Sequence, residues 1–228
     1  MIKYLLTLAM SFWALLAPAQ EAKDLQGAWQ TEGATLTLVD GFFSYAAFDA
    51  DQASFQGTKG GAWSLANGKI NLKYEYHTWD SSRVGTPESL AIRLEDGRLM
   101  LGEQTFTRMD NGTPGLLNGA WLISGRMQDG KMSEMTPGPR KTLKILSGTR
   151  FQWIAYHTGT KQFMGTGGGT YTTQAGKYVE NIEFFSRDSS RVGASLSFDY
   201  ERKDGKWHHQ GKSSKGDPIY EVWSERKD

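Results

Sequence analysis

Hydrophobic and polar residues alternate with a period of two along much of this chain. Residues 69–76 (KINLKYEY), 89–94 (SLAIRL) and 196–200 (LSFDY) each place apolar side chains at every second position. This period is typical of strands with one buried face, whereas an amphipathic helix repeats every 3.6 residues. No long window after residue 19 has the helical period. The pattern therefore predicts an all-β protein.

Turn signals separate these strands. Asn67-Gly68, Asp96-Gly97 and Asp204-Gly205 each stand between two alternating stretches. Asn-Gly and Asp-Gly favour two-residue hairpin turns, because both turn residues need a positive φ. The chain is therefore predicted to run through short antiparallel strands that pair with their neighbours in sequence.

The alternation repeats along the chain. Residues 43–85 align with residues 151–193 without a gap, at a constant shift of 108, and 16 of the 43 pairs are identical. The matches include Gly60-Gly61 with Gly168-Gly169. The hexapeptide DSSRVG recurs unchanged at 80–85 and 188–193. We infer a tandem duplication.

The start of each repeat carries a further match. Residues 25–29 (LQGAW) resemble residues 117–121 (LNGAW), and Thr35-Leu36 aligns with Thr142-Leu143 at a shift of 107. This alignment puts a one-residue insertion before Phe151. Copies of this length fall in the range of independent domains. We expect one at 20–109 and one at 117–228, joined by a linker at 110–116 that contains Asn-Gly and Pro-Gly turn signals.

Each repeat contains about eight predicted strands. Eight strands linked by hairpins most simply close into an antiparallel up-and-down barrel, because closure leaves no exposed edge. Such a barrel has room for its own side chains or for one small ligand. A sandwich or a half-open barrel is the alternative.

Several short motifs together resemble a known family. They are the Leu-x-Gly-x-Trp opening, residues 150–156 (RFQWIAY), residues 167–172 (GGGTYT) and residues 178–180 (YVE). This set is similar to the lipocalin-like domains of unknown function found in secreted proteins of Gram-negative bacteria. The likeness covers residues 117–226 well and the first repeat more loosely. It implies a small calycin-type barrel with an internal pocket, and it implies no reaction.

The N-terminus resembles a secretory signal peptide. Lys3 precedes an apolar run at 4–16, and Ala17-Pro18-Ala19 fits the small-residue rule for cleavage. The run is shorter than the ~20 residues that span a bilayer, so we expect a signal peptide at 1–19 rather than an uncleaved anchor. The mature protein would then be periplasmic or secreted, with no integral membrane segment.

Composition narrows the classes of function. Without residues 1–19 the chain carries 25 basic and 25 acidic side chains, a balance that gives no reason to bind nucleic acid. The absence of cysteine excludes disulfides and thiolate chemistry. The four histidines lack a metal-binding spacing, and glycine-rich residues 165–169 lack the helix that a phosphate loop needs. We therefore expect no metal and no cofactor.

The strand after the Gly-Lys turn contains the most informative candidate. In repeat one, Ile70, Leu72, Tyr74 and Tyr76 share one parity, and this face is expected to point into the barrel. The matching residues of repeat two are Tyr178, Glu180, Ile182 and Phe184. Glu180 thus stands where repeat one has Leu72, and a buried carboxylate is costly unless it is paired or hydrogen-bonded.

The last strand offers a second carboxylate. Glu221 shares its parity with Trp223 and is expected to face inward, with Arg191 as a candidate counter-ion. An apolar site with a few polar groups is typical of small-molecule binding. The predicted ligand-binding residues are Trp153, Tyr171, Tyr178, Glu180, Arg191, Glu221 and Trp223.

Structural explanations of the same residues stay open. Glu180 and Glu221 fit equally a buried Glu–Tyr or Glu–Arg network that holds the fold, or a carboxylate wetted at the barrel mouth. Asp80-Ser81-Ser82-Arg83 and its twin are interpreted as turns, since Asp and Ser bond to the backbone of their own loop.

Three functions are therefore considered, and binding is favoured over catalysis. The first is binding of a small apolar or amphipathic molecule in the second barrel. The second is hydrolysis by Glu180 and Glu221 as an acid–base pair, as in glycosidases. The third is an envelope interaction module that contacts a protein or glycan and has filled barrels.

The exported protein is predicted to begin at Gln20. N-terminal sequencing and the intact mass of periplasmic protein from a Gram-negative host test this cleavage site. Ala19→Arg, which removes the small residue at the site, is expected to block processing. Recovery of the uncut wild-type chain in the membrane fraction would instead support an anchor.

Overall fold

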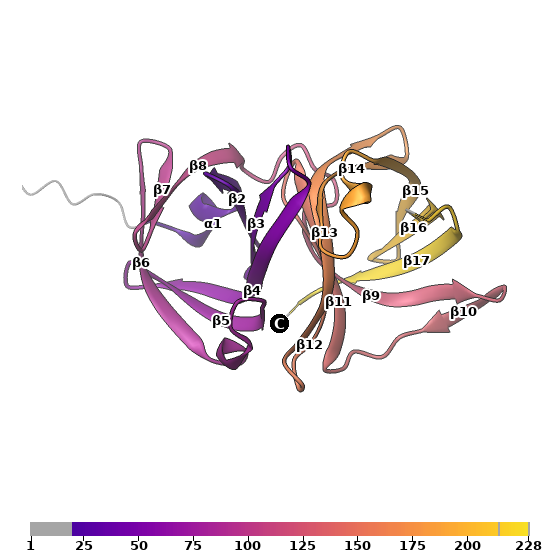
Figure 1. The fold of residues 1–228 in the computed structure, drawn as a ribbon, viewed down its shortest axis with the longest axis horizontal. Coiled ribbons are helices and arrows are strands. Elements are labelled where there is room, and N and C mark those ends of the chain that lie inside the picture. Colours follow the sequence, from indigo (N-terminus) through magenta and orange to yellow (C-terminus); the bar gives the residue numbers. More distant parts are fainter. Residues whose placement is uncertain (1–19, 214, 228) are drawn as a thin grey trace, which may run out of the picture.

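The structure, a computed structural model, describes residues 20–213 and 215–227; the predicted signal peptide lies outside them. These residues form two closed antiparallel barrels of eight strands that lie side by side (Figure 1). The prediction of two tandem eight-stranded barrels is confirmed. None of the helices in this part of the chain is long and apolar enough to cross a membrane.

Barrel 1 is a simple meander in which each strand pairs with the next and β8 closes onto β1. A single helical turn, α1 (Ala22–Leu25), precedes it, and a 3-10 turn, η1 (Ser81–Arg83), follows β5. Its strands are β1 (Gly27–Thr31), β2 (Ala34–Val39), β3 (Phe42–Asp49), β4 (Ser54–Ala66), β5 (Lys69–His77), β6 (Pro87–Glu95), β7 (Arg98–Leu101) and β8 (Gln104–Asp110).

Barrel 2 has the same meander, closed by pairing of β17 with β9, and one additional strand. That strand, β10, pairs with the far half of β9 and forms a hairpin arm that extends beyond the barrel (Figure 1). The elements are β9 (Gly119–Gln128), β10 (Lys131–Glu134), β11 (Arg140–Leu146), β12 (Arg150–His157), β13 (Gln162–Gln174), β14 (Lys177–Phe185), η2 (Ser189–Arg191), β15 (Ser195–Lys203), β16 (Lys206–Lys212) and β17 (Pro218–Glu225).

The expected turns are present. Asn67, Asp96 and Asp204 adopt φ values of 52°, 49° and 52°, each followed by a glycine with positive φ. The repeated Asp-Ser-Ser-Arg segments form η1 and η2. In each, the Asp carboxylate accepts a hydrogen bond from the backbone N–H two residues later, at 3.0 Å for Asp80 and 3.1 Å for Asp188. These segments are local scaffolding, as predicted.

The Leu-x-Gly-x-Trp openings close one end of each barrel. Trp29 Nε1 donates to the Leu25 carbonyl at 2.8 Å, and Trp121 Nε1 donates to the Leu117 carbonyl at 2.9 Å. All four side chains are fully buried. The motif thus packs the segment that enters each barrel across one end of that barrel. In barrel 1, the Arg108 guanidinium also stacks on Trp29, 3.9 Å from the ring centroid.

Strand register corrects the alignment of the two repeats. Trp29 pairs with Leu36 across β1 and β2, and Trp121 pairs with Lys144 across β9 and β11. Lys144 is therefore the counterpart of Leu36. The shift between them is 108, as it is for residues 43–85 and 151–193, so the expected one-residue insertion before Phe151 is wrong. The extra residues of repeat two lie instead between β9 and β11, where β10 is added.

A β-bulge corrects the predicted inward face. On β5, Gly61 opposes Tyr74 but Gly60 opposes Tyr76, so Glu75 is an extra residue. Strand parity changes there, and Tyr76 packs in a cluster between the barrels while Ile70, Leu72 and Tyr74 stay inside. Glu183 has the same role on β14, and Phe184 likewise leaves the interior.

The residues redirected in this way join the two barrels with internal two-fold symmetry. Tyr76 packs on Tyr156 at 5.0 Å between ring centroids, and the symmetry-related pair Phe48 and Phe184 packs at 4.6 Å. Phe55 stacks on its own counterpart, Phe163. Equivalent positions therefore meet across the contact, as in an isologous dimer interface.

A buried amide lies at the centre of this interface. Gln152 Nε2 donates to the hydroxyls of Thr58 at 3.0 Å and of its counterpart Thr166 at 2.9 Å. Ser44, the counterpart of Gln152, donates to Gln152 Oε1 and accepts from the Tyr76 hydroxyl at 2.8 Å. Each polar group thus has a partner, which offsets the cost of its burial.

The repeated Gly-Gly pair makes room for this contact. A Cβ atom on Gly60 would lie 2.1 Å from the Tyr76 hydroxyl, and one on Gly168 would lie 2.6 Å from the Phe184 ring. Both distances are far below van der Waals contact. Only glycine lets these rings lie across the strand, which explains why the pair occurs in both repeats.

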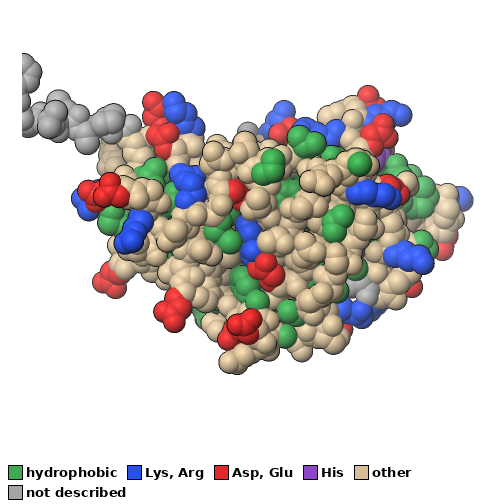
Figure 2. All heavy atoms as spheres, turned by 90° about the horizontal axis from the view of Figure 1, so that it is seen from above, with side chains coloured by type: hydrophobic (Ala, Val, Ile, Leu, Met, Phe, Trp, Pro, Cys, Tyr) green, Lys and Arg blue, Asp and Glu red, His purple; other side chains and the backbone are tan. Residues whose placement is uncertain are grey.

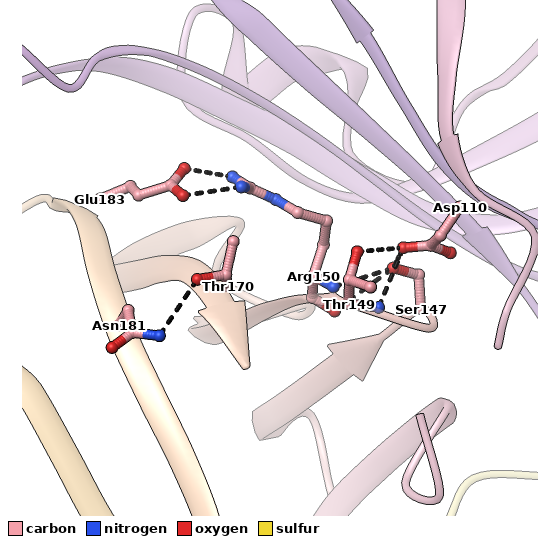
Figure 3. Close-up of polar contacts among 7 residues, drawn as sticks. All are labelled: Asp110, Ser147, Thr149, Arg150, Thr170, Asn181 and Glu183. Atoms are coloured by element: carbon pink, nitrogen blue, oxygen red, sulfur yellow. Dashed lines mark hydrogen bonds and ion pairs between the residues drawn. The ribbon is translucent and has the colours of Figure 1, made fainter. Parts of the chain in front are cut away.

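Asp110 ties the end of barrel 1 to barrel 2 (Figure 3). It is the last residue of β8, although the sequence placed it in the linker. Its carboxylate accepts hydrogen bonds from the backbone N–H groups of Gly112, Gly148 and Thr149, each at 2.9 Å, and from the hydroxyls of Ser147 and Thr149. The connection between the barrels is thereby fixed at a buried point.

Acidic and basic side chains are interspersed with hydrophobic ones on the face shown in Figure 2. This mixture agrees with the near-zero net charge of the chain. The face therefore offers no large surface of one charge for a polyanion.

Asp110→Asn is predicted to destabilise the protein by about 2 kcal/mol at pH 7, since hydrogen bonds to a charged acceptor are lost. Burial raises the pKa of Asp110, but its hydrogen bonds outweigh this and hold the pKa below its usual value. The stabilisation is therefore complete above about pH 4 and is lost as the pH falls further.

Urea unfolding of wild type and variant at pH 7 and about pH 2.5 measures this difference. Asp129→Asn, in an exposed turn with positive φ, is the matched control and should change little. A difference for Asp110→Asn that is undiminished at the lower pH would contradict the assignment.

Candidate functional site

The interior of barrel 2 contains a buried ion pair. Glu180 faces inward, as predicted, and its Oε1 lies 2.7 Å from Lys144 Nζ on β11. The Tyr178 hydroxyl donates to the same oxygen at 2.8 Å. The Lys144 and Glu180 side chains are each 6% exposed, so both charges are paired away from water.

Aromatic rings surround this lysine. Lys144 Nζ lies 5.0 Å from the ring centroids of Tyr178 and Trp207 and 5.2 Å from that of Trp223. Cation–π attraction on several sides adds to the ion pair. The ammonium is thus held at the centre of barrel 2.

A second charged group lies beside the first. Glu221 Oε1 accepts from Arg126 on the β9–β10 arm at 2.5 Å, and Glu221 Oε2 lies 3.5 Å from His209 Nδ1. Burial lowers the pKa of His209, and Lys144 adds to this effect, so the ring is neutral at pH 7. Burial raises the pKa of Glu221, but His209, Lys144 and Arg126 outweigh it and lower that pKa to about 2.

The structure brings only part of the predicted site together. Tyr178, Glu180, Glu221 and Trp223 meet around Lys144. The Tyr171 ring packs on Tyr178 with 5.5 Å between the ring centroids, but its hydroxyl points away and donates a hydrogen bond to the Ser147 carbonyl. Trp153 packs against Phe185.

The proposed counter-ion is corrected. Arg191 donates to Asp188 in its own 3-10 turn at 3.0 Å, whereas Lys144 pairs with Glu180 and Arg126 pairs with Glu221. In repeat one the equivalent arginine, Arg83, pairs instead with Glu88 at 2.8 Å.

Sequence reasoning missed Lys144, His209 and Arg126. A constant shift of 108 would have aligned Lys144 with Leu36, the same kind of exchange as Glu180 for Leu72. In the sequence, His209 is one of four histidines without a metal-binding spacing. The structure places His209 inside, while His208 contacts the Tyr220 hydroxyl.

Barrel 1 has an apolar cavity where barrel 2 has these charges. The cavity has a volume of about 50 Å³, and Leu36, Leu72, Leu101 and Gln104 line it. Strand register makes them the counterparts of Lys144, Glu180, His209 and Glu221. The same positions therefore surround space in one barrel and form a charged network in the other.

Side-chain size accounts for the remaining difference. Ile70, Leu90 and Tyr45 line the cavity of barrel 1, and their counterparts in barrel 2 are Tyr178, Phe198 and Trp153. Tyr178 and Phe198 pack at 6.1 Å between ring centroids in the barrel 2 core. Larger rings thus fill the volume that stays open in barrel 1.

A surface depression lies at the mouth of barrel 1, beside this cavity. It has a volume of about 560 Å³ and lies between the β1–β2 turn and the end of β3. Tyr45 lines both the depression and the cavity, so this ring separates the two spaces. Lys59 is on the neighbouring strand and also lines the cavity.

A polar group beside the mouth holds the β5–β6 connection. The Tyr74 hydroxyl donates to Glu88, which also pairs with Arg83 at 2.8 Å. His77 Nδ1 accepts from the Asp80 N–H at 3.0 Å. Burial lowers the pKa of His77, with Lys59 and Arg83 adding to it, so this ring is neutral at pH 7.

The two barrel 2 carboxylates do not suit acid–base hydrolysis. A glycosidase acid must be protonated near neutral pH, which requires a raised pKa. The pKa of Glu221 is instead lowered to about 2, and Glu180 is held in a buried ion pair. Among residues 20–213 and 215–227, no three His, Cys, Asp or Glu side chains are placed to bind a metal ion.

Comparison with known protein families and with curated proteins gives no match to this chain. The site must therefore be interpreted from its own geometry.

Lys144→Met is predicted to destabilise the protein by about 3–5 kcal/mol, because Glu180 would remain buried without its partner. The double variant Lys144→Met, Glu180→Leu is expected to recover most of this loss, since leucines occupy both positions in barrel 1. A double-mutant cycle in urea measures the coupling. Additive losses in the double variant would show that the two groups do not act as a pair.

Proposed function

We propose that this protein binds a small apolar or amphipathic molecule, and that barrel 1 rather than barrel 2 is the binding domain. One observation carries the proposal: the four positions that form a charged network in barrel 2 line an apolar cavity in barrel 1. Duplication supplies the comparison, because both barrels close with the same strand order.

The cavity sets the size of the ligand. A volume of about 50 Å³ accommodates roughly four water molecules, and an apolar cavity of this kind favours an apolar occupant over water. The depression at the mouth is about tenfold larger and lies within the usual size range of ligand sites. A short apolar group in the cavity, with the rest of the molecule at the mouth, fits both volumes.

The cellular location of the protein is proposed from the sequence alone. The predicted signal peptide would place the protein in the periplasm or outside the cell, where small apolar compounds are poorly soluble and a carrier is useful. The resemblance of the sequence motifs to lipocalin-like domains favours the same function.

A second candidate function is supported by the β9–β10 arm. Met127 and Met132 are cross-strand partners on this arm, 40% and 41% exposed, and β10 is an edge strand. Exposed methionine pairs and strand edges are features of protein contact sites. An envelope protein is the partner this arm would fit.

Xenon is predicted to bind in barrel 1, because apolar cavities take up this single apolar atom and it needs less space than a ring. Xenon under pressure should shift the NMR methyl signals of Leu36, Leu72 and Leu101, which line the cavity. The methyl signals of Ile182 and Leu196 in barrel 2 are the internal control and should stay in place.

Leu72→Phe is expected to weaken xenon binding about tenfold or more, since the added ring occupies cavity volume. Leu116→Phe makes the same chemical change at a position 59% exposed and should not alter binding. Shifts confined to barrel 2, or no shifts at high xenon pressure, would overturn the assignment to barrel 1.

A further inference from the structure

Lys59 is the one charged side chain that lines the cavity of barrel 1. Ten other residues line it, and of these only Gln104 has a polar group that is not a phenol. The lysine is half-buried on β4. Its ammonium is therefore the strongest electrostatic feature that a molecule in the cavity would meet.

This ammonium has no ionic partner within the described residues. No carboxylate lies at ion-pair distance from Lys59 there, and Glu88, whose charge acts on it, is already bonded to Arg83 and Tyr74. Its neighbours are instead two rings, with Nζ 5.5 Å from the centroid of Tyr45 and 5.9 Å from that of Tyr74. Lys59 is half-buried, and this burial lowers its pKa.

The fold does not require a lysine at this position. Its counterpart in barrel 2 is Gly167, and the counterpart of Glu88 is Leu196. Barrel 2 closes with the same topology without either charge. Lys59 is thus a feature of the barrel that has the cavity, and burying an unpaired charge needs a compensating interaction.

We propose that the ligand of barrel 1 is a small amphipathic anion, whose carboxylate pairs with Lys59 while its apolar chain enters the cavity. Arg83, 5.2 Å from the Tyr74 ring and paired with Glu88, offsets the negative charge of that carboxylate on the same side. The leucines and Phe106 supply the apolar contacts. This inference rests on the proposed function and adds the charge of the ligand to it.

Three probes with the same six-carbon chain test the charge. Hexanoate, hexan-1-ol and protonated hexylamine are titrated into the mature full-length protein at pH 7.5 by calorimetry. Hexanoate is expected to bind about tenfold more tightly than hexan-1-ol, because a charge-assisted hydrogen bond is gained. Hexylammonium should bind most weakly, since its charge repels Lys59.

Variants assign the preference to Lys59. Lys59→Met should abolish the advantage of hexanoate over hexan-1-ol, and Lys59→Arg should retain it. Lys73→Met, an exposed lysine on the outer face of β5, is the matched control and should behave as wild type. Circular dichroism verifies that each variant is folded.

The outcomes separate the two proposals. Equal affinity for hexanoate and hexan-1-ol, or a preference that survives in Lys59→Met, would overturn the anionic ligand while leaving apolar binding in place. Failure of all three probes and of xenon to bind would overturn the proposed function itself.

Discussion

One extra residue in β5, and another in β14, determines which side chains face the interior and which join the barrels. Glu75 and Glu183 are these residues, and the change of parity at each turns the next aromatic ring outward. Each glutamate also binds an arginine near the interface: Arg226 Nη2 lies 2.5 Å from Glu75 Oε1, and Arg150 pairs with Glu183. The bulge thus determines which rings leave the interior and form the contact between the barrels.

The two barrels use the same interior in different ways. In barrel 2, Lys144 compensates Glu180 and Arg126 compensates Glu221, neutral His209 lies beside Glu221, and large rings fill the rest. In barrel 1, three leucines and Gln104 at the positions of Lys144, Glu180, His209 and Glu221 leave space. A charged network of this kind adds little net stability over an apolar core, so its contribution here is to occupy the volume with one defined arrangement.

The sequence was sufficient for the strands, the turns and the inward position of Glu180, because each depends on local periodicity or on a turn dipeptide. It was insufficient for identifying Lys144 as the partner of Glu180. The insertion that contains β10 hides where β11 begins relative to β2, and so hides that Lys144 corresponds to Leu36. The outward direction of Tyr76 and Phe184 also could not be predicted. The alternation of polar and apolar residues does not reveal the bulges at Glu75 and Glu183, which change the side on which the next side chain lies. Locating the cavity required a comparison of side-chain volumes at equivalent positions of the two barrels, such as Ile70 in barrel 1 and Tyr178 in barrel 2.

The interface between the barrels has the symmetry of a homodimer, with Phe48 on Phe184 and Tyr76 on Tyr156 as equivalent contacts. In a homodimer every substitution occurs in both subunits at once, so neither can lose its cavity while the other retains it. Placing both copies on one chain removes that restriction. Gln152 facing Ser44 at the centre shows the result, since a pair of unlike residues has replaced what symmetry would make identical.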